Sequence, residues 1–308
     1  MPDFLSTALL YVLLSLPLIG AYALLGLGVT VIYQASRVVN LAHGALAMVA
    51  AYTTYQMVAR WHVPMFLAIA FGIVIGGALG LLVEVVFIRR LRGAGPTTQT
   101  VGTVAALTLA IAVVSRVYGT LPVQDMPKVL PAGALHLGRT GFVPWDQITI
   151  FPISVIAAGL LFGLLQFTDL GLAMRGAAQN RRGAALRGVD PNWTGALAWV
   201  LGGAFAGLAG ILLAGARGLD PFTVSLGVLP AFIAALIGGL ESMPGVLLGA
   251  VIVGVIEGMV PALSVIPQIS GIAQSQGAPE LVLGVVALVV MALRGQRLAT
   301  SDIRADAL

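Results

Sequence analysis

Two short motifs in this sequence place a polar or acidic residue four positions before a glycine, and an apolar stretch rich in small residues follows each of them. Such polar groups can satisfy the free backbone of an interrupted helix, and paired interruptions in two halves of a chain are typical of a transport pathway. Ordinary tight turns also favour Asn, Ser, Pro and Gly, so that interpretation stays open beside the first. The candidate path or gate residues are Asn40, His43, Gly44, Glu241, Ser242 and Gly245.

The polar residues of these motifs have different expected roles. Asn40 is predicted to cap a helix that starts near Ala42, because lipid offers no partner to free backbone N–H groups. His43 could be a gate or a solute ligand, but a packing histidine bonded to a neighbouring carbonyl is the favoured interpretation. Glu241 is interpreted as either a helix cap or a gate residue.

The composition indicates which solvent surrounds the elements that must position these residues. Hydrophobic residues make up 59% of the 308 residues and charged residues only 9%, whereas a soluble domain carries about 25% charged residues. So few charges cannot cover a surface that faces water. Several uncharged stretches reach the roughly 20 residues that a helix needs to cross a bilayer. Lipid is therefore the expected solvent for most of the chain.

The uncharged stretches predict an all-α polytopic membrane protein of about nine transmembrane helices, within a range of eight to ten. Residues 1–308 are expected to form a single transmembrane domain with two internally related halves, 1–147 and 148–308, which contain interrupted or short helices. Whether the halves are parallel or inverted stays open. The expected helices are 5–33, 38–58, 65–88, 100–117, 148–166, 194–216, 228–240, 244–262 and 279–293.

The arginines predict the orientation of the chain. They gather in three clusters, which the positive-inside rule places in the cytoplasm. The N-terminus then lies outside and the C-terminus lies in the cytoplasm. The connection 118–147 is expected outside and non-helical, because it contains four prolines. The clusters are Arg89, Arg90 and Arg92; Arg175, Arg181, Arg182 and Arg187; and Arg294, Arg297 and Arg304.

The cytoplasmic segment 169–193 carries small residues at helical spacing, with arginines on a different face. This pattern predicts a short helix under the membrane that ends at Gly188, and Asp190 and Pro191 then begin the next crossing. The small-residue face could insert into a groove on a partner protein, or the basic helix could rest on anionic lipid. The residues assigned to coupling are Met174, Ala177, Ala178, Arg182, Ala185 and Gly188.

The sequence excludes several kinds of chemistry. It contains no cysteine, so neither a disulfide nor a thiolate metal site can form, and no metal site is expected. Its one lysine, Lys128, follows Met126 and Pro127 instead of a glycine-rich loop, so a phosphate-binding P-loop cannot form. The chain lacks hydrolase motifs such as G-x-S-x-G and is not expected to be an enzyme. If ATP drives transport, the ATPase must be a separate subunit, and segment 169–193 is the best candidate to dock it.

Three long blocks carry a family resemblance: VVNLAHGALAMVAAY, LRGVDPNWTGALAWVLGGAFAGLAGILLA and ALIGGLESMPGVLLGAVIVGVIEG. They resemble the membrane permeases of branched-chain amino acid (LIV-type) ABC importers, in the order that the family has them. The resemblance implies a permease domain in a bacterial inner membrane that moves branched-chain or related amino acids inward. Similar permeases serve urea and short amides, so those solutes stay open as alternatives.

The same resemblance implies a set of partners. They are two ABC ATPase subunits that bind ATP and Mg, a second homologous permease or a second copy of this chain, and a periplasmic or lipid-anchored solute-binding protein. Membrane lipid surrounds the chain, which is expected to bind no cofactor and no nucleic acid itself. Segment 169–193 would dock the ATPase. The sequence departs from the family at Arg37, where relatives are often glycine-rich and uncharged.

An ion-coupled secondary carrier is the alternative from another class. Such a carrier would need chains of buried Asp, Glu or His, and this sequence has only isolated acids at Glu84 and Glu257. Those two residues are interpreted as interface or interhelical hydrogen-bonding groups. A purely structural membrane subunit stays open as well, although it would not need two glycine-rich breaks.

Overall fold

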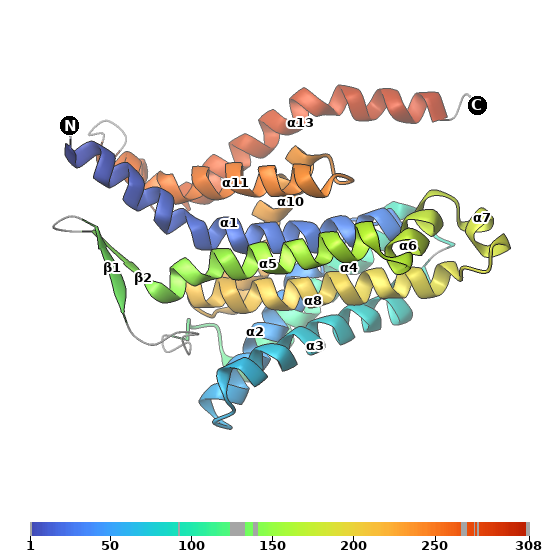
Figure 1. Cartoon of the computed structure of the whole chain (residues 1–308), viewed down its shortest axis with the longest axis horizontal. Helices are drawn as coiled ribbons and strands as arrows, with labels where there is room; N and C mark the ends of the chain where they lie inside the picture. Colours follow the sequence, from blue (N-terminus) through green and yellow to red (C-terminus); the bar gives the residue numbers. More distant parts are fainter. Residues whose placement is uncertain are drawn as a thin grey trace.

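The computed structural model of the chain describes residues 2–91, 93–123, 133–137, 141–265, 270–273, 275 and 277–305. Over these residues the protein is a bundle of long helices with one small β-hairpin (Figure 1). The long elements are α1 (Pro2–Ser36), α2 (His43–Ala59), α3 (Met65–Val83), α4 (Pro96–Tyr118), α5 (Trp145–Phe167), α8 (Pro191–Arg217), α11 (Met243–Met259) and α13 (Ala278–Ala305). The shorter ones are η1 (Glu84–Ile88), β1 (Ala134–Leu137), β2 (Gly141–Pro144), α6 (Asp169–Gln179), α7 (Arg181–Leu186), α9 (Pro221–Leu226), α10 (Val228–Gly238), η2 (Val260–Val265) and α12 (Ser270–Ala273).

Seven helices of the described chain are long and apolar enough to cross a membrane. Helix α2 has 17 residues, and the apolar part of α13, Ala278–Ala292, is also short. The chain is therefore a multi-pass, predominantly helical membrane protein. The seven spans are Leu9–Ser36, Met65–Ile88, Thr97–Tyr118, Trp145–Phe167, Pro191–Arg217, Pro221–Gly238 and Met243–Leu263.

For one helix, 228–240, the predicted start lies too far along the chain. The apolar span starts at Pro221, because α9 precedes α10 and the two helices meet at Gly227. The side chain of Asp220 caps α9 by accepting hydrogen bonds from the backbone N–H groups of Phe222 and Thr223, at 3.0 and 2.9 Å. An aspartate followed by proline is a strong signal for a helix start. The added turns give this segment the length that the prediction lacked.

Helices α1 and α8 form the centre of the bundle. Helix α1 packs against α5, α8, α10 and α11, and α8 packs against α1, α2 and α3. Figure 1 shows α10 and α11 on one side of α1 and the α3–α8 pair on the other. Helix α4 is the least buried of the seven spans. These two helices therefore form the scaffold on which most of the other long helices pack.

Glycines let α3 and α8 pack at close range. A Cβ atom at Gly76 would lie 3.0 Å from the Cα of Gly207 and nearer still to the carbonyl oxygen of Gly203. Gly203 and Gly207 are four residues apart on α8, which is the small-xxx-small spacing that allows membrane helices to approach closely. The α3–α8 pair is thus a rigid part of the scaffold.

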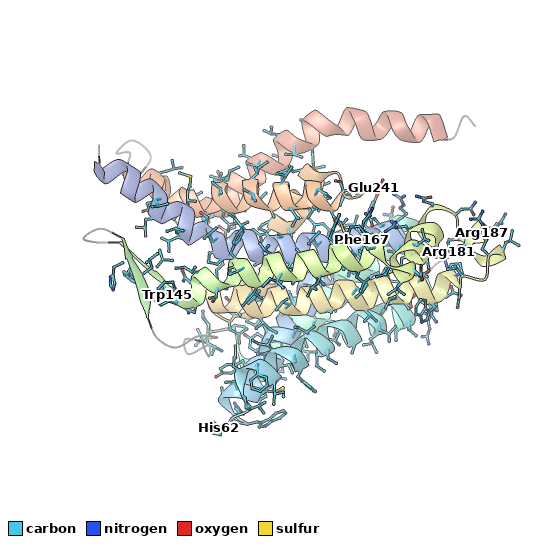
Figure 2. All side chains as sticks on the ribbon, in the orientation of Figure 1. His62, Trp145, Phe167, Arg181, Arg187 and Glu241 are labelled. Carbon is cyan, nitrogen blue, oxygen red and sulfur yellow. The ribbon has the colours of Figure 1, made fainter. Side chains whose placement is uncertain are left out.

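The bundle has two distinct ends. Figure 2 shows Arg181, Arg187 and Glu241 at one end, which we name the arginine-rich end, and His62 and Trp145 toward the other, which we name the hairpin end. The fold places Arg181 and Arg187, from one predicted cytoplasmic cluster, at the same end as Glu241. Several predicted basic positions lie outside the described residues or have side chains outside them: Arg92, Lys128, Arg139, Arg294, Arg297 and Arg304.

The hairpin end carries the only strands among the described residues. Strands β1 and β2 are antiparallel, and Leu135 pairs with Val143. They lie within the connection 118–147, which the prolines predict to be non-helical. Residues 119–123 and 133–137 and strand β2 are non-helical, as predicted, but α4 extends to Tyr118 and α5 already begins at Trp145. The sequence did not predict the hairpin itself. Residues 124–132 and 138–140 of this connection lie outside the described chain.

Candidate functional site

The first motif interrupts the chain between α1 and α2. Arg37 takes a positive φ of 57° directly after α1 ends, and α2 begins at His43. The backbone N–H of Leu41 is satisfied by Thr103 Oγ1 of α4, at 3.1 Å. The predicted helix start near Ala42 is therefore confirmed to within one residue, and α4 supplies a hydrogen-bond partner for the break.

The predicted cap at Asn40 is wrong. The N-cap position of α2 is Ala42, and no side chain caps the helix there. The Asn40 side chain is buried, and neither its oxygen nor its nitrogen has a hydrogen-bond partner in the described chain. Only its backbone carbonyl bonds the new helix, by accepting from the N–H of His43 at 3.3 Å. A capping side chain must fold back toward the free N–H groups at the start of the helix, and the side chain of Asn40 does not.

His43 packs between α1 and α8. Its imidazole is fully buried, and a Cβ atom at Gly28 of α1 would lie 2.7 Å from the ring atoms Cε1 and Nε2 and 2.9 Å from the carbonyl oxygen of Gly202. Neither ring nitrogen has a hydrogen-bond partner of good geometry within the described residues. The contacts of His43 are those of a packing residue.

Gly44 packs directly against α9. A Cβ atom there would lie 2.9 Å from the carbonyl carbon of Ser225 and closer still to its oxygen. Ser225 itself is fully buried, and its hydroxyl donates to the carbonyl of Pro221. The first motif therefore anchors α2 to the α9–α10 segment inside the protein.

The second motif forms the turn between α10 and α11. Gly239 and Leu240 both take positive φ values, of 91° and 58°, so the chain reverses within a few residues. Ser242 caps α11, because its Oγ accepts from the backbone N–H of Gly245 at 3.2 Å. Gly245 lies against α10, since a Cβ atom there would sit 2.6 Å from the carbonyl oxygen of Gly238. The cap is therefore Ser242, which leaves the carboxylate of Glu241 free of that role.

Glu241 joins the α10–α11 turn to the end of α1. Its carboxylate forms an ion pair with Arg37, and its backbone carbonyl accepts a hydrogen bond from Gln34 Nε2. The hydrogen bond to Glu241 raises the pKa of Arg37 above its ordinary value, so Arg37 stays charged at any physiological pH. The two side chains are 56% and 58% exposed. Exposed pairs of this kind contribute only about 0–1 kcal/mol, so this link is weak.

A second ion pair, at the other end of α11, differs in burial. Arg217 at the end of α8 pairs with Glu257 in the last turn of α11, and the two side chains are 25% and 2% exposed. Removing one partner of a buried pair costs about 3–5 kcal/mol, because the other charge is left without compensation. Glu257 is thus an interhelical group, as its isolation in the sequence indicates. Of the two ion pairs at the ends of α11, the one near the hairpin end is therefore the stronger.

Segment 169–193 forms two short helices instead of the predicted one. Asn180 ends α6 and also caps α7, because its Oδ1 accepts from the backbone N–H of Gly183 at 2.8 Å. The predicted end at Gly188 is confirmed: its φ is 82°, and the N–H groups of Gly188 and Val189 bond back to Ala185 and Ala184. The sequence prediction overlooked the capping ability of Asn180.

The small residues of this segment do not share one exposed face. Met174 and Ala177 are buried, and Met174 belongs to a cluster with Leu165 of α5 and Val246 of α11. The expectation that Met174 and Ala177 insert into a groove on a partner is therefore wrong, because this chain already covers them. Leu186 at the end of α7 is 89% exposed instead.

A cavity of about 440 Å³ lies at the arginine-rich end, between the ends of α1 and α5, helix α6 and the α10–α11 turn. It unites parts of both predicted groups: Glu241 and Ser242 from the gate, and Met174 and Ala178 from the coupling segment. The predicted site residues outside its lining are Asn40, His43, Gly44, Gly245, Ala177, Arg182, Ala185 and Gly188. The one link from the first break to this cavity is Arg37.

A family model for the permease component of branched-chain amino acid transport systems matches residues 10–293. The chain belongs to this family.

Three curated relatives of the permease are themselves named as transport permeases, two of them for branched-chain amino acids. The high-affinity branched-chain amino acid transport system permease protein BraD of Pseudomonas aeruginosa is 30% identical over 254 residues, which is 77% of this chain and 80% of BraD. The probable branched-chain amino acid transport permease protein LivH of Methanocaldococcus jannaschii is 28% identical over 87% of this chain and 84% of its own length. The galactofuranose transporter permease protein YtfT of Escherichia coli is 30% identical over 89% of this chain and 76% of its own length.

Among solved structures, PsaBC from Streptococcus pneumoniae in complex with Fab resembles the permease with a TM-score of 0.46 and 15% identity, over 90% of this chain and 89% of that one.

Two functional contacts of the permease were missed by sequence reasoning. The partners in the Arg37–Glu241 pair are 204 positions apart, and those in the Arg217–Glu257 pair are 40 apart. Glu257 was noted as isolated in apolar sequence and Glu241 as a cap or gate residue, and each arginine stands at a helix end. A charge in lipid must be paired or reach the interface. The sequence could therefore have predicted that these two acids pair with arginines, but not which arginine pairs with which acid.

Proposed function

We propose that the permease is the membrane-spanning subunit of an ABC importer that carries branched-chain or related amino acids into a bacterial cell. The observation that carries the mechanism is the cavity at the arginine-rich end. Its walls include α6, from the predicted coupling segment, and the α10–α11 turn that Arg37 holds to α1. A force applied to α6 from the cytoplasm would therefore act across this cavity on the turn.

The energy source and the partners follow from the chain's own chemistry. No P-loop can form around Lys128, so ATP and Mg would be bound by two separate ATPase subunits. Exposed α7, with Leu186 at its end, would dock them. A second permease subunit, homologous or identical, would complete the membrane domain, and an external binding protein would deliver the solute. The family relationship supports each of these partners.

The proposed threading has nine crossings, with the arginine-rich end in the cytoplasm of a bacterial inner membrane. The positive-inside rule supports this side. Successive long helices run in alternating directions between the two ends (Figure 1). Helices α2 and α13 supply the two crossings that are shorter than the seven long spans. The N-terminus then lies outside and the C-terminus inside.

The unequal ion pairs support a particular gate. Breaking the exposed Arg37–Glu241 pair costs about 0–1 kcal/mol, whereas breaking the buried Arg217–Glu257 pair costs about 3–5 kcal/mol. Helix α11 is therefore expected to swing at its cytoplasmic end and to stay fixed near Glu257. Glu241 and Ser242 are then gate residues, while Asn40, His43 and Gly44 belong to the static core.

The solute is tested by reconstitution. Proteoliposomes that contain the permease, its partner permease and ATPases are supplied with binding protein and ATP, and uptake of labelled L-leucine is measured against competing L-isoleucine, urea, acetamide and galactofuranose. We expect L-isoleucine to compete and the other three to leave uptake unchanged. ATP-independent uptake under an ion gradient would contradict the importer mechanism. Galactofuranose uptake without leucine uptake would show that the solute is the one for which YtfT is named.

A further inference from the structure

The cavity at the arginine-rich end has two kinds of wall. Val31 of α1, Phe162 and Leu165 of α5 and Met243 of α11 form an apolar wall. Charged and amide side chains also line the space, including one cation that has no acid beside it in the lining, Arg175. Its volume of about 440 Å³ falls in the range of small-molecule sites, roughly 300–1,000 Å³. Such a space suits a small ligand that is both charged and aliphatic.

Arg175 supplies an unused donor. Its Nη1 atom is buried, and it has no hydrogen-bond partner within the described part of the chain. A buried N–H group without an acceptor is unfavourable, because it has lost water and gained nothing in exchange. A rotation of the guanidinium toward the cavity, which Arg175 lines, would let an anionic group there remove that deficit. A guanidinium is also well matched to a carboxylate, which it can bind through two parallel hydrogen bonds.

Glu241 supplies the opposite charge in the same lining. Its carboxylate bonds Arg37 through Oε1, and a carboxylate offers about four acceptor positions in all. The pair with Arg37 is exposed and weak, so an ammonium group can join it or displace Arg37 at little cost. One cavity thus combines an acceptor for an ammonium, a donor for a carboxylate and an apolar wall.

We propose that this cavity binds a zwitterionic aliphatic amino acid from the cytoplasmic side. Its carboxylate lies at Arg175, its ammonium lies at Glu241, and its side chain lies against Val31, Leu165 and Met243. The choice of an amino acid rests on the proposed function. A ligand held in this way ties α6 to the α10–α11 turn, and gate opening requires those two elements to separate. Accumulated product therefore slows ATP hydrolysis from the inside.

The first experiment measures binding. The permease–ATPase complex is placed in lipid nanodiscs without binding protein, and equilibrium binding of labelled L-leucine is measured. We expect saturable binding that N-acetyl-L-leucine, without an ammonium, and isoamylamine, without a carboxylate, fail to displace. Arg175→Gln and Glu241→Gln should each weaken binding at least tenfold, which corresponds to about 1.4 kcal/mol. Arg90→Gln removes an exposed arginine near the same end and should bind like the unmodified complex.

The second experiment measures the consequence. With binding protein already saturated, further L-leucine should lower the ATPase rate at least twofold, and N-acetyl-L-leucine should not. Met243→Trp fills the apolar part of the cavity while both charged residues remain, and it should abolish binding and inhibition together. Each variant is first shown to keep its ATPases and a monodisperse elution peak.

The outcomes separate this inference from the function on which it rests. Normal leucine uptake without saturable cytoplasmic binding would overturn the product site and leave the importer function intact. Binding that survives Arg175→Gln, Glu241→Gln and Met243→Trp would place the ligand elsewhere and overturn the assignment. Failure of leucine uptake itself would overturn the proposed solute, and the choice of amino acid with it.

Discussion

Gly44→Ala is the smallest change that should loosen the anchoring of α2. The added Cβ atom would lie 2.9 Å from the carbonyl carbon of Ser225 and closer still to its oxygen, and real Cβ contacts essentially never fall below 3.0 Å. Both obstructing atoms are backbone, so no side-chain rotation can relieve the clash, and α2 must separate from α9. Overpacking of this kind costs about 1–3 kcal/mol. Because relief requires a shift of a whole helix, we expect the upper end, about 3 kcal/mol.

Gly215→Ala provides the matched control. Gly215 lies on α8, the helix that also contains Gly202. It is exposed, and no atom lies within 4 Å of its ideal Cβ position. Alanine there should be neutral or stabilise by about 0.4–1 kcal/mol. The measurement is the temperature at which half of the detergent-solubilised complex loses its monodisperse elution peak. We expect a clear decrease for Gly44→Ala and none for Gly215→Ala. Equal midpoints for Gly44→Ala and the unmodified complex would refute the contact between α2 and α9.

Three further predictions test orientation, ion pairs and docking. In this cysteine-free chain, Arg181→Cys should react with an impermeant thiol reagent only from the cytoplasmic side and Leu135→Cys only from outside; reversed labelling would invert the threading. Glu257→Gln should lower the free energy of unfolding by about 3 kcal/mol, because it leaves a mostly buried arginine without its acid. Glu241→Gln should change that free energy by less than about 1 kcal/mol. Similar losses in thermal-stability measurements of the two variants would contradict the difference between the two ends of α11. Leu186→Glu should leave the permease inserted but release its ATPases on purification, and full retention would move the docking site off α7.

Local signals in the sequence predicted the helix boundaries that depend on neighbouring residues. Asp190 caps α8, since its Oδ1 accepts from the backbone N–H of Asn192 at 2.8 Å, and Gly188 ends α7 with a positive φ. Both features rest on residues within one or two turns of each other. Asn180 follows the same rule. It was overlooked because the small residues on either side of it stand at helical spacing, which predicted one continuous helix.

Tertiary partners could not be predicted in the same way. Among the glycines of α11, Gly245 and Gly249 lie against α10, whereas Gly254 lies against Ile19 of α1. Helical spacing gives the direction in which a residue points, but it does not say which helix lies there. The burial of Met174 escaped prediction for the same reason, because an apolar residue on a basic helix fits a partner protein and the chain's own core equally well.

The two motifs that look alike in sequence therefore have unlike mechanical roles. The first is fixed from several sides, because His43 fills the space beside Gly28 and Gly44 lies on the backbone of Ser225. Moving it would disturb α1, α8 and α9 together. The second ends in a turn whose carboxylate, at Glu241, is half in solvent and held by one exposed arginine. Under the proposed function, an ATPase that pushed on α6 would meet least resistance there. We therefore propose that the gate belongs to the second motif and that the first provides the fixed surface against which it moves.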